Sequence, residues 1–225
     1  ETSTEATLSV SQWTVTDAEG NKYTGVVIGD QVWTVENWRC EYYNDGTTPI
    51  PHVAESSEWE GLDGPGFCYY DNDTLNTDFK EKYGALYNWY AVIEPNFAPE
   101  GWHVPTNEEW TTLENSVRDA GYEWTGKALA AQTDWEFNDR EGAVGTDQLS
   151  NNASGFTALP GGSRTVGGSF QSHGYYGYWW SATESGETGA YVHYLWWDYA
   201  HLDISQASKG RHGFSVRLVR DLARP

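Results

Sequence analysis

The side chains that could take part in chemistry are six histidines, two cysteines and one cluster of oxygen-bearing residues. The cluster runs from Asp71 to Asp78 and includes Asn72, Asp73 and Asn76. Calcium prefers such oxygen ligands, but an EF-hand loop also needs a central Gly and a terminal Glu, which this segment lacks. We therefore expect a solvated acidic turn and no cofactor, with a weak calcium site near Asp71–Asp78 as the alternative.

The spacing of the other reactive residues argues against an enzyme. No serine lies in a nucleophile-elbow pattern, and the pairs Gly161-Gly162 and Gly167-Gly168 lack the lysine of a phosphate-binding loop. Both glycine pairs are typical of turns. His103 stands between Trp102 and Val104, which predicts a hydrogen-bonded core histidine.

Cys40 and Cys68 are the only cysteines, and two states are open to them. In an oxidising compartment they would form a disulfide that closes a loop of about 28 residues and contributes about 3–4 kcal/mol. Two free thiols are the alternative. We predict the disulfide, because neither cysteine has another cysteine with which to pair.

Composition limits the class of protein. The 225 residues include 13 Trp and 15 Tyr, which indicates an ordered domain, and a net charge of −20 that disfavours nucleic acid and anionic membranes as partners. The chain contains no Met and no apolar run of about 18 residues, so we expect no membrane insertion and an export signal that has been removed.

The elements that position these residues form one domain over residues 13–222, behind a flexible tail over 1–12. A hairpin is predicted at Trp13–Ile28, with its turn at Gly20-Asn21. The clearest helix covers 107–119 behind a capping box of Thr106 and Glu109. Alternation at Phe214, Val216 and Leu218 predicts a half-buried closing strand. These patterns favour a loop-rich α+β fold of short antiparallel strands and one or two helices.

The aromatic segment over 175–221 holds the candidate binding site. A strand must run between Ala190 and Asp203, and placing Leu195 inward turns the alternate residues outward. Trp and Tyr offer flat apolar surfaces with a polar group, which suit both sugar rings and protein partners. The alternative is that these rings pack into a large core. The predicted ligand-binding residues are Val192, Tyr194, Trp196, Asp198, Tyr199, His201, Asp203 and His212.

Several long motifs in order resemble the Fibrobacter succinogenes major paralogous domain family, over roughly Trp13 to Asp221. The motifs are Thr14-Val-Thr-Asp-Ala-Glu-Gly-Asn-Lys-Tyr, Ile28-Gly-Asp-Gln-Val-Trp, Tyr83-Gly-Ala-Leu-Tyr-Asn-Trp-Tyr-Ala-Val, Gly101-Trp-His-Val-Pro-Thr, Gly155-Phe-Thr-Ala-Leu-Pro-Gly-Gly, Gly177-Tyr-Trp-Trp-Ser-Ala-Thr and Gly213-Phe-Ser-Val-Arg. The resemblance implies a C-type-lectin-like fold, related to that of the formylglycine-generating enzyme. It also implies export to the surface of Bacteroidetes-like bacteria, as a secreted protein or a lipoprotein.

The chain departs from the resembled proteins where their chemistry would lie. Many members carry cysteines at the positions of Ala98 and Leu218, so Cys40 and Cys68 would supply an alternative disulfide. The formylglycine-generating enzyme needs a pair of active-site cysteines, and the related sulfoxide synthases hold iron through a His-x-x-x-His pattern that this chain lacks. Glu94-Pro95-Asn96 matches a tripeptide of calcium-dependent lectins, but its position before Gly101 predicts a turn.

Three functions remain open from the sequence. The first is a non-catalytic extracellular domain that binds a glycan or protein on an external surface, as in adhesion. The second is a retroelement-diversified receptor-binding protein whose C-terminal segment varies, which a near-copy of the 3′ coding segment would reveal. The third is a structural module of a surface or pilus assembly, which burial of the aromatic segment in a neighbouring subunit would reveal.

Overall fold

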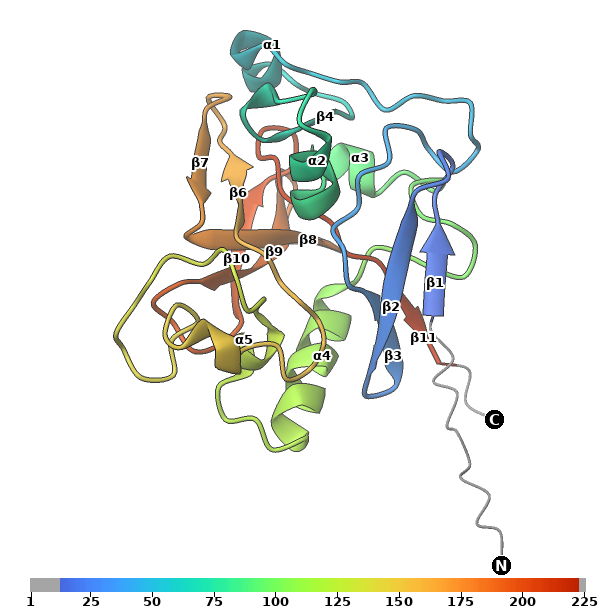
Figure 1. Ribbon diagram of the computed structural model, residues 1–225. Coiled ribbons are helices and arrows are strands. Elements are labelled where there is room, and N and C mark those ends of the chain that lie inside the picture. The colour runs from blue at the N-terminus through green and yellow to red at the C-terminus, as the bar shows by residue number, and fades with distance from the viewer. Residues whose placement is uncertain (1–12, 223–225) are drawn as a thin grey trace, which may run out of the picture.

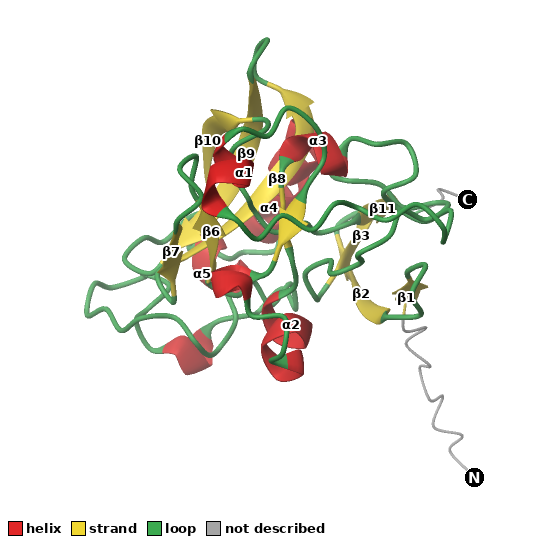
Figure 2. Ribbon diagram, turned by 90° about the horizontal axis from the view of Figure 1, so that it is seen from above, coloured by secondary structure: helices red, strands yellow, loops and turns green. Residues whose placement is uncertain are grey.

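Two sheets stand on opposite sides of the molecule in the computed structural model, which describes residues 13–222 (Figures 1 and 2). The smaller sheet has the order β1-β2-β3-β11 and is antiparallel throughout. Its strands are β1 (Trp13–Thr16), β2 (Lys22–Ile28), β3 (Gln31–Thr34) and β11 (Val219–Asp221). The predicted N-terminal hairpin is confirmed, whereas the predicted tail over 1–12 lies outside the described residues.

The larger sheet has the order β10-β9-β8-β6-β7. Its pairs are antiparallel except β6–β8, which is parallel, so the expectation of antiparallel strands holds for all but this contact. The strands are β6 (Gly161–Arg164), β7 (Phe170–His173), β8 (Tyr176–Glu184), β9 (Gly189–Trp196) and β10 (Asp203–Ser208), and a separate pair joins β4 (Phe67–Cys68) to β5 (Leu86–Tyr87).

The longest helix in the described residues is α4 (Asn107–Asp119), as the sequence predicts. Thr106 Oγ1 accepts from Glu109 N at 3.2 Å while Glu109 Oε2 accepts from Thr106 N at 2.7 Å, so the capping box is confirmed. The other helices are single turns or little more: α1 (Ser56–Glu60), η1 (Tyr70–Asn72), α2 (Thr77–Tyr83), α3 (Trp89–Val92), α5 (Thr125–Leu129) and η2 (Gln148–Ser150). The fold is therefore mixed α+β, dominated by sheets and loops.

The closing segment, residues 213–221, is a correction to the sequence analysis. Only Val219–Asp221 forms a strand, and every residue over 213–219 is buried, rather than alternate ones. The segment makes isolated bridges to Arg164, Tyr87 and Trp179 before it reaches β3. The segment therefore links both sheets and is enclosed on all sides. For this reason its residues do not alternate between buried and exposed positions.

The core forms two large clusters that share the larger sheet between them. One contains Trp180, Val192 and Phe214, and the other packs Trp179 and Leu195 of the sheet against Trp110 of α4. Both faces of β8 and β9 are thus covered along part of their length. Within residues 13–222, no helix combines the length and the apolar character that crossing a bilayer requires.

Candidate functional site

The pairing of β8 with β9 places large rings in register on one face of the larger sheet. Tyr176 lies opposite Trp196, and Tyr178 lies opposite Tyr194. Residues paired across two strands point to the same face, because side chains alternate along each strand. Tyr199 follows β9 directly. We call these five residues, Tyr176, Tyr178, Tyr194, Trp196 and Tyr199, the aromatic face.

The aromatic face is a continuous set of ring contacts. Tyr176 stacks on Tyr178 with centroids 5.4 Å apart and an interplanar angle of 3°. Tyr194 lies 5.6 Å from Tyr178 and 5.5 Å from Trp196, which lies 5.3 Å from Tyr199. All five side chains are half-buried. They present ring surface to solvent from fixed positions, which is what stacking on a ligand requires.

Polar groups border these rings. The Tyr194 hydroxyl donates to Asp203 Oδ2 at 3.2 Å, and burial together with this carboxylate raises the pKa of Tyr194 to about 12. Asp198 is half-buried and near enough to Tyr176 to raise its pKa, after the effect of burial. The Trp196 indole Nε1 is buried and has no hydrogen-bond partner in the described residues. Carboxylates beside half-exposed rings can accept hydrogen bonds from hydroxyl or amide groups.

The structure brings together most of the predicted site residues. Tyr194, Trp196, Asp198, Tyr199 and Asp203 meet at the aromatic face, and His201 extends it, with its ring 5.7 Å from that of Tyr199. These six residues are half-buried, so neither full burial nor full exposure describes them.

Val192 and His212 differ from the prediction. Val192 is 2% exposed, pairs with Trp180 of β8 and belongs to the core cluster that also contains Phe214. Its predicted outward placement is wrong. His212 stacks on the buried Phe214 at 5.4 Å and accepts a hydrogen bond from Ser208 N at 3.2 Å. Burial lowers its pKa, and its ring supports the core beside the aromatic face.

The sequence analysis missed Tyr176 and Tyr178, which lie on β8. The signal was present, because Tyr176, Tyr178 and Trp180 alternate with Gly177 and Trp179 and so share one side of a strand. The exposed part of that side could be identified only from the strand pairing.

The opposite face of β9 is core. His193 stacks on Trp110 of α4 at 5.0 Å, and its Nε2 lies 3.0 Å from Asn107 Oδ1. Burial lowers the pKa of His193 to about 3, so its ring is neutral at pH 7. This histidine joins helix to sheet and faces away from the aromatic face.

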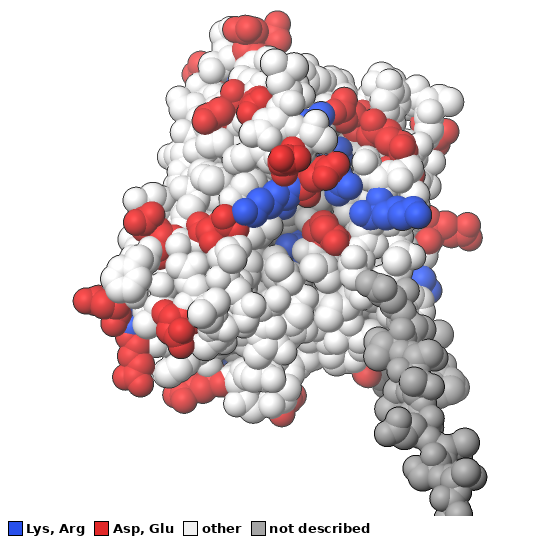
Figure 3. All heavy atoms as spheres, in the orientation of Figure 1, with Lys and Arg blue, Asp and Glu red and all other residues white. Residues whose placement is uncertain are grey.

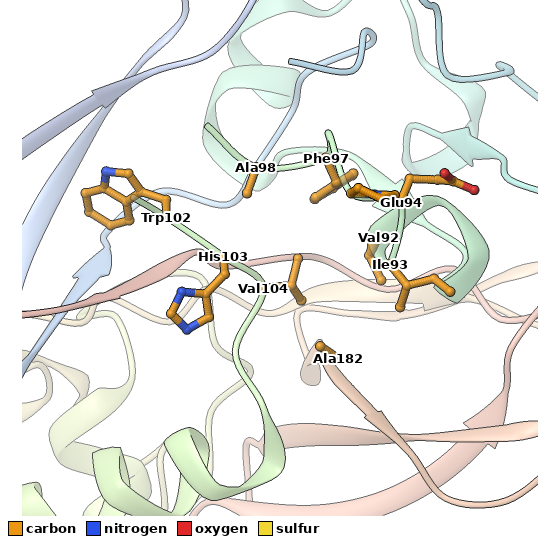
Figure 4. Close-up of a pocket in the computed structure, with 10 residues that line it drawn as sticks. Val92, Ile93, Glu94, Phe97, Ala98, Trp102, His103, Val104 and Ala182 are labelled. Carbon is orange, nitrogen blue, oxygen red and sulfur yellow. The ribbon is translucent and has the colours of Figure 1, made fainter. Parts of the chain in front are cut away.

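A separate cavity of about 310 Å³ lies beside the Gly101-Trp-His-Val-Pro segment (Figure 4). Its lining combines apolar side chains with polar surface, since Glu94 and His103 line it beside Val92, Phe97 and Ala182. The Glu94 carboxylate points away from His103 in Figure 4, so the two do not form a polar pair. Glu94-Pro95-Asn96 forms the predicted turn, in which Phe97 N donates to Glu94 O at 2.9 Å.

His103 is half-exposed rather than a core residue, and its Nε2 lies 2.6 Å from Glu109 Oε1. This hydrogen bond, opposed by burial, raises the pKa of His103. Burial alone would raise the pKa of Glu109, but the hydrogen bonds from His103 and Thr106 outweigh it and lower that pKa. The two groups therefore form an ion pair below neutral pH.

We expect the His103–Glu109 pair to stabilise the fold only in a limited pH window. Because the pKa of His103 is raised, the stabilisation from the ion pair is lost as the pH rises through that pKa. Because the pKa of Glu109 is lowered, the stabilisation is also lost in acid, as the pH falls through the pKa of Glu109. The window is about pH 5–7. Unfolding in urea should show His103→Asn less stable by under ~1 kcal/mol inside the window, since solvent screens the pair, and equal to wild type at pH 9. A difference that does not change with pH would contradict the ion pair.

The predicted Cys40–Cys68 disulfide is wrong: both cysteines are free and buried. They lie in different core clusters, and Cys40 Sγ donates to Tyr42 O at 2.9 Å. Burial raises the pKa of each thiol to about 12. Two protonated thiols enclosed in separate parts of the core can neither pair nor react at neutral pH.

The cluster over 71–78 uses its oxygens for local structure. Asp73 Oδ1 accepts from Leu75 N and Asn76 N, and Asn76 Oδ1 caps α2 at Phe79 N. Within residues 13–222, the one group of three His, Cys, Asp or Glu ligand atoms within 4.8 Å of one another is Asp17, Glu19 and Cys40.

The Asp17, Glu19 and Cys40 group is a poor metal site. The Asp17 carboxylate already accepts from the Tyr23 hydroxyl at 2.7 Å, and the Cys40 thiol is protonated. That folding needs no metal stays a prediction: EDTA should leave the melting temperature unchanged. A decrease of more than about 5 °C would contradict it, since this corresponds to about 1 kcal/mol.

Comparison with known proteins places the chain in a family. The model of the Fibrobacter succinogenes major domain matches residues 26–220, which include the aromatic face and the Gly101-Trp-His-Val-Pro segment. No curated protein and no solved structure matches the chain. Since the match extends from β2 to β11, the chain belongs to the Fibrobacter succinogenes major domain family.

Proposed function

We propose that this protein is a non-catalytic domain that binds a glycan or protein ligand through the aromatic face of its larger sheet. The observation that carries the proposal is the set of five half-buried rings, in contact and bordered by Asp198 and Asp203. Rings held by strand pairing lose little freedom when a ligand stacks on them, so each contributes more to affinity.

A sugar suits the aromatic face in two respects. The apolar C–H faces of a pyranose stack on Tyr and Trp rings, and carboxylates accept from its hydroxyl groups. The net charge of −20 and the acidic residues spread over the surface in Figure 3 argue against nucleic acid.

We further infer a C-type-lectin-like arrangement and a place outside the cell, on its surface or secreted. The pairing of N-terminal β3 with C-terminal β11 supports the first, because such folds bring their two ends together. The family supports the second. In this arrangement the aromatic face would be presented to ligands, and a lipid anchor or other segment would hold the domain.

Trp196→Ala tests the proposal. We expect wild type to bind a subset of sugars on a glycan array, and Trp196→Ala to lose at least about tenfold in affinity for the best of them by calorimetry, since stacked aromatic anchors are frequent hot spots. Trp196→Phe, which keeps a ring, should retain part of the binding.

Tyr191→Ala is the matched control. Tyr191 is half-buried on the same strand but points to the opposite side, where it pairs with Gln206. Its variant should bind as wild type does. The glycan form of the proposal fails if no sugar binds wild type, and the site fails if Trp196→Ala and Tyr191→Ala bind equally while both melt cooperatively.

A further inference from the structure

A second group of rings, which shares no residue with the aromatic face, lines a small cavity near η1 and α2. The cavity measures about 130 Å³, and Tyr70, Phe79, His173, Asp71 and Asp73 line it. The three aromatic rings thus come from three elements, η1, α2 and β7. Of the two carboxylates, Asp71 belongs to η1 and Asp73 follows it directly. We call these five residues the cation cage.

We propose that the cation cage binds a quaternary ammonium head group. Aromatic faces attract organic cations through the negative charge above the ring, and enclosing rings with nearby carboxylates are the arrangement that recognises such groups. The ring centroid of Tyr70 lies 6.3 Å from that of Phe79 and 5.2 Å from that of His173, and Phe79 and His173 are 5.3 Å apart. The cavity has room for a compact head group.

Packing fixes the rings of the cage in place. Tyr83 supports it from behind, with its ring 4.5 Å from Phe79 and 4.7 Å from His173. A Cβ at Gly162 would lie 2.8 Å from Cε2 of Tyr70, so only glycine lets this ring take its position. Walls held in this way need no rearrangement when a ligand enters.

The charges of the cage suit a cation. Asp71 is exposed, and its carboxylate makes no hydrogen bond or ion pair within the described residues, whereas Asp73 already accepts from Leu75 N and Asn76 N. Burial lowers the pKa of His173, so this wall is uncharged at neutral pH. The Nε2 atom of His173 is buried and has no partner among residues 13–222.

The neighbouring ring of Tyr83, which does not line the cavity, already contacts one cation. Lys82 Nζ lies 5.4 Å from the centroid of Tyr83 and is paired with Asp134 at 2.8 Å. Neither lining carboxylate, Asp71 or Asp73, forms an ion pair with a cationic side chain in the described part of the chain. The backbone of Asp71 is left-handed (φ 54°), as is that of Asn72 (φ 53°).

The probes are choline and 3,3-dimethylbutan-1-ol, which has the same shape without the charge. Titration of the whole chain, followed by NMR shifts of phenylalanine ring signals, should show choline binding and little binding of the neutral alcohol. Phosphocholine distinguishes the source: binding equal to that of choline indicates a lipid-type head group, and weaker binding indicates a free amino alcohol.

Two variants locate the site. Asp71→Asn keeps a residue that tolerates the left-handed backbone and should weaken choline binding about fivefold. Phe79→Leu should weaken it by a similar factor. Asp78→Asn is the matched control, because Asp78 is an exposed carboxylate on α2 that does not line the cavity, and it should bind as wild type does.

The proposal is overturned if wild type binds choline no better than the neutral alcohol. It is also overturned if Asp71→Asn and Asp78→Asn bind choline equally. Neither result bears on the aromatic face, because the cation cage shares no residue with it.

Discussion

Replacing Arg217 by Met is expected to destabilise the protein by about 4 kcal/mol. Arg217 is fully buried, and its guanidinium donates to Asn37 Oδ1 at 2.7 Å, Thr34 O at 2.6 Å and Phe156 O at 3.0 Å, and also to Thr157 O. Burial lowers its pKa to about 9, so the group remains charged at neutral pH. Methionine would remove the donor from three backbone carbonyls, whereas Asn37 Oδ1 would still accept from Trp179 Nε1 at 2.9 Å. Each buried acceptor left unsatisfied costs about 1–3 kcal/mol before relaxation.

The measurement is urea unfolding of Arg217→Met beside Arg118→Met. Arg118 is an exposed arginine on α4, paired with Glu114 at 3.0 Å one helical turn away, and its loss should cost under about 0.5 kcal/mol. Arg217→Lys should also be strongly destabilised, because a single ammonium cannot reach acceptors arranged for a planar fork. If the two Met variants unfold at the same urea concentration, Arg217 does not organise the core.

Lys127→Met is expected to cost about 2–4 kcal/mol, although the residue is a lysine on a short helix. Its Nζ is almost enclosed and donates to Asn151 Oδ1 at 2.9 Å, to Asp147 O at 3.2 Å and to Thr146 O. Burial lowers the pKa of Lys127. Removing the ammonium would leave Asn151 Oδ1 without this donor in the core and two partly buried carbonyl oxygens close to it.

Amide hydrogen exchange can locate the effect of Lys127→Met along the chain. In Lys127→Met, amides over 144–152 should exchange faster than in wild type, and the melting temperature should fall. Lys82→Met is the control, since Lys82 makes an ion pair with Asp134 but is 45% exposed, so its loss should cost under ~1 kcal/mol. Unchanged hydrogen-exchange protection over 144–152 would show that the loop keeps its structure without the lysine.

Sequence patterns predicted the elements that neighbouring residues determine. The capping box at Thr106 and Glu109, the hairpin around Gly20 and the turn at Glu94 each depend on contacts within a few residues, and all are present. The family could also be identified from the motifs, and the match over residues 26–220 confirms it. The strand between Ala190 and Asp203 is also present, as β9, whereas its role in ligand binding stays a prediction.

Burial determined by distant segments could not be predicted from local patterns. Val192 lies on the same side of β9 as Tyr194, yet Val192 is buried in the core and Tyr194 is half-buried. The sequence pattern places Arg217 and Ser215 on the polar side of a strand, but both residues lie in the core. Their polar side-chain atoms form hydrogen bonds with Asn37, about 180 positions away in the sequence. The predicted disulfide was wrong for the same reason, because the number of cysteines does not show in which core cluster each of them lies.

The enclosed closing segment also sets the order in which this molecule can form during synthesis. Trp38 N donates to Val216 O at 2.8 Å and Thr34 N donates to Leu218 O at 2.9 Å, so the first strands take their last partners from the end of the chain. The smaller sheet is not complete until β11 has left the ribosome, whereas the last strand of the larger sheet ends earlier, at Ser208. Domains that depend on strand pairs between residues far apart in the sequence fold slowly, on the order of milliseconds to seconds. The smaller sheet would therefore form only after the rest of the domain has been synthesised.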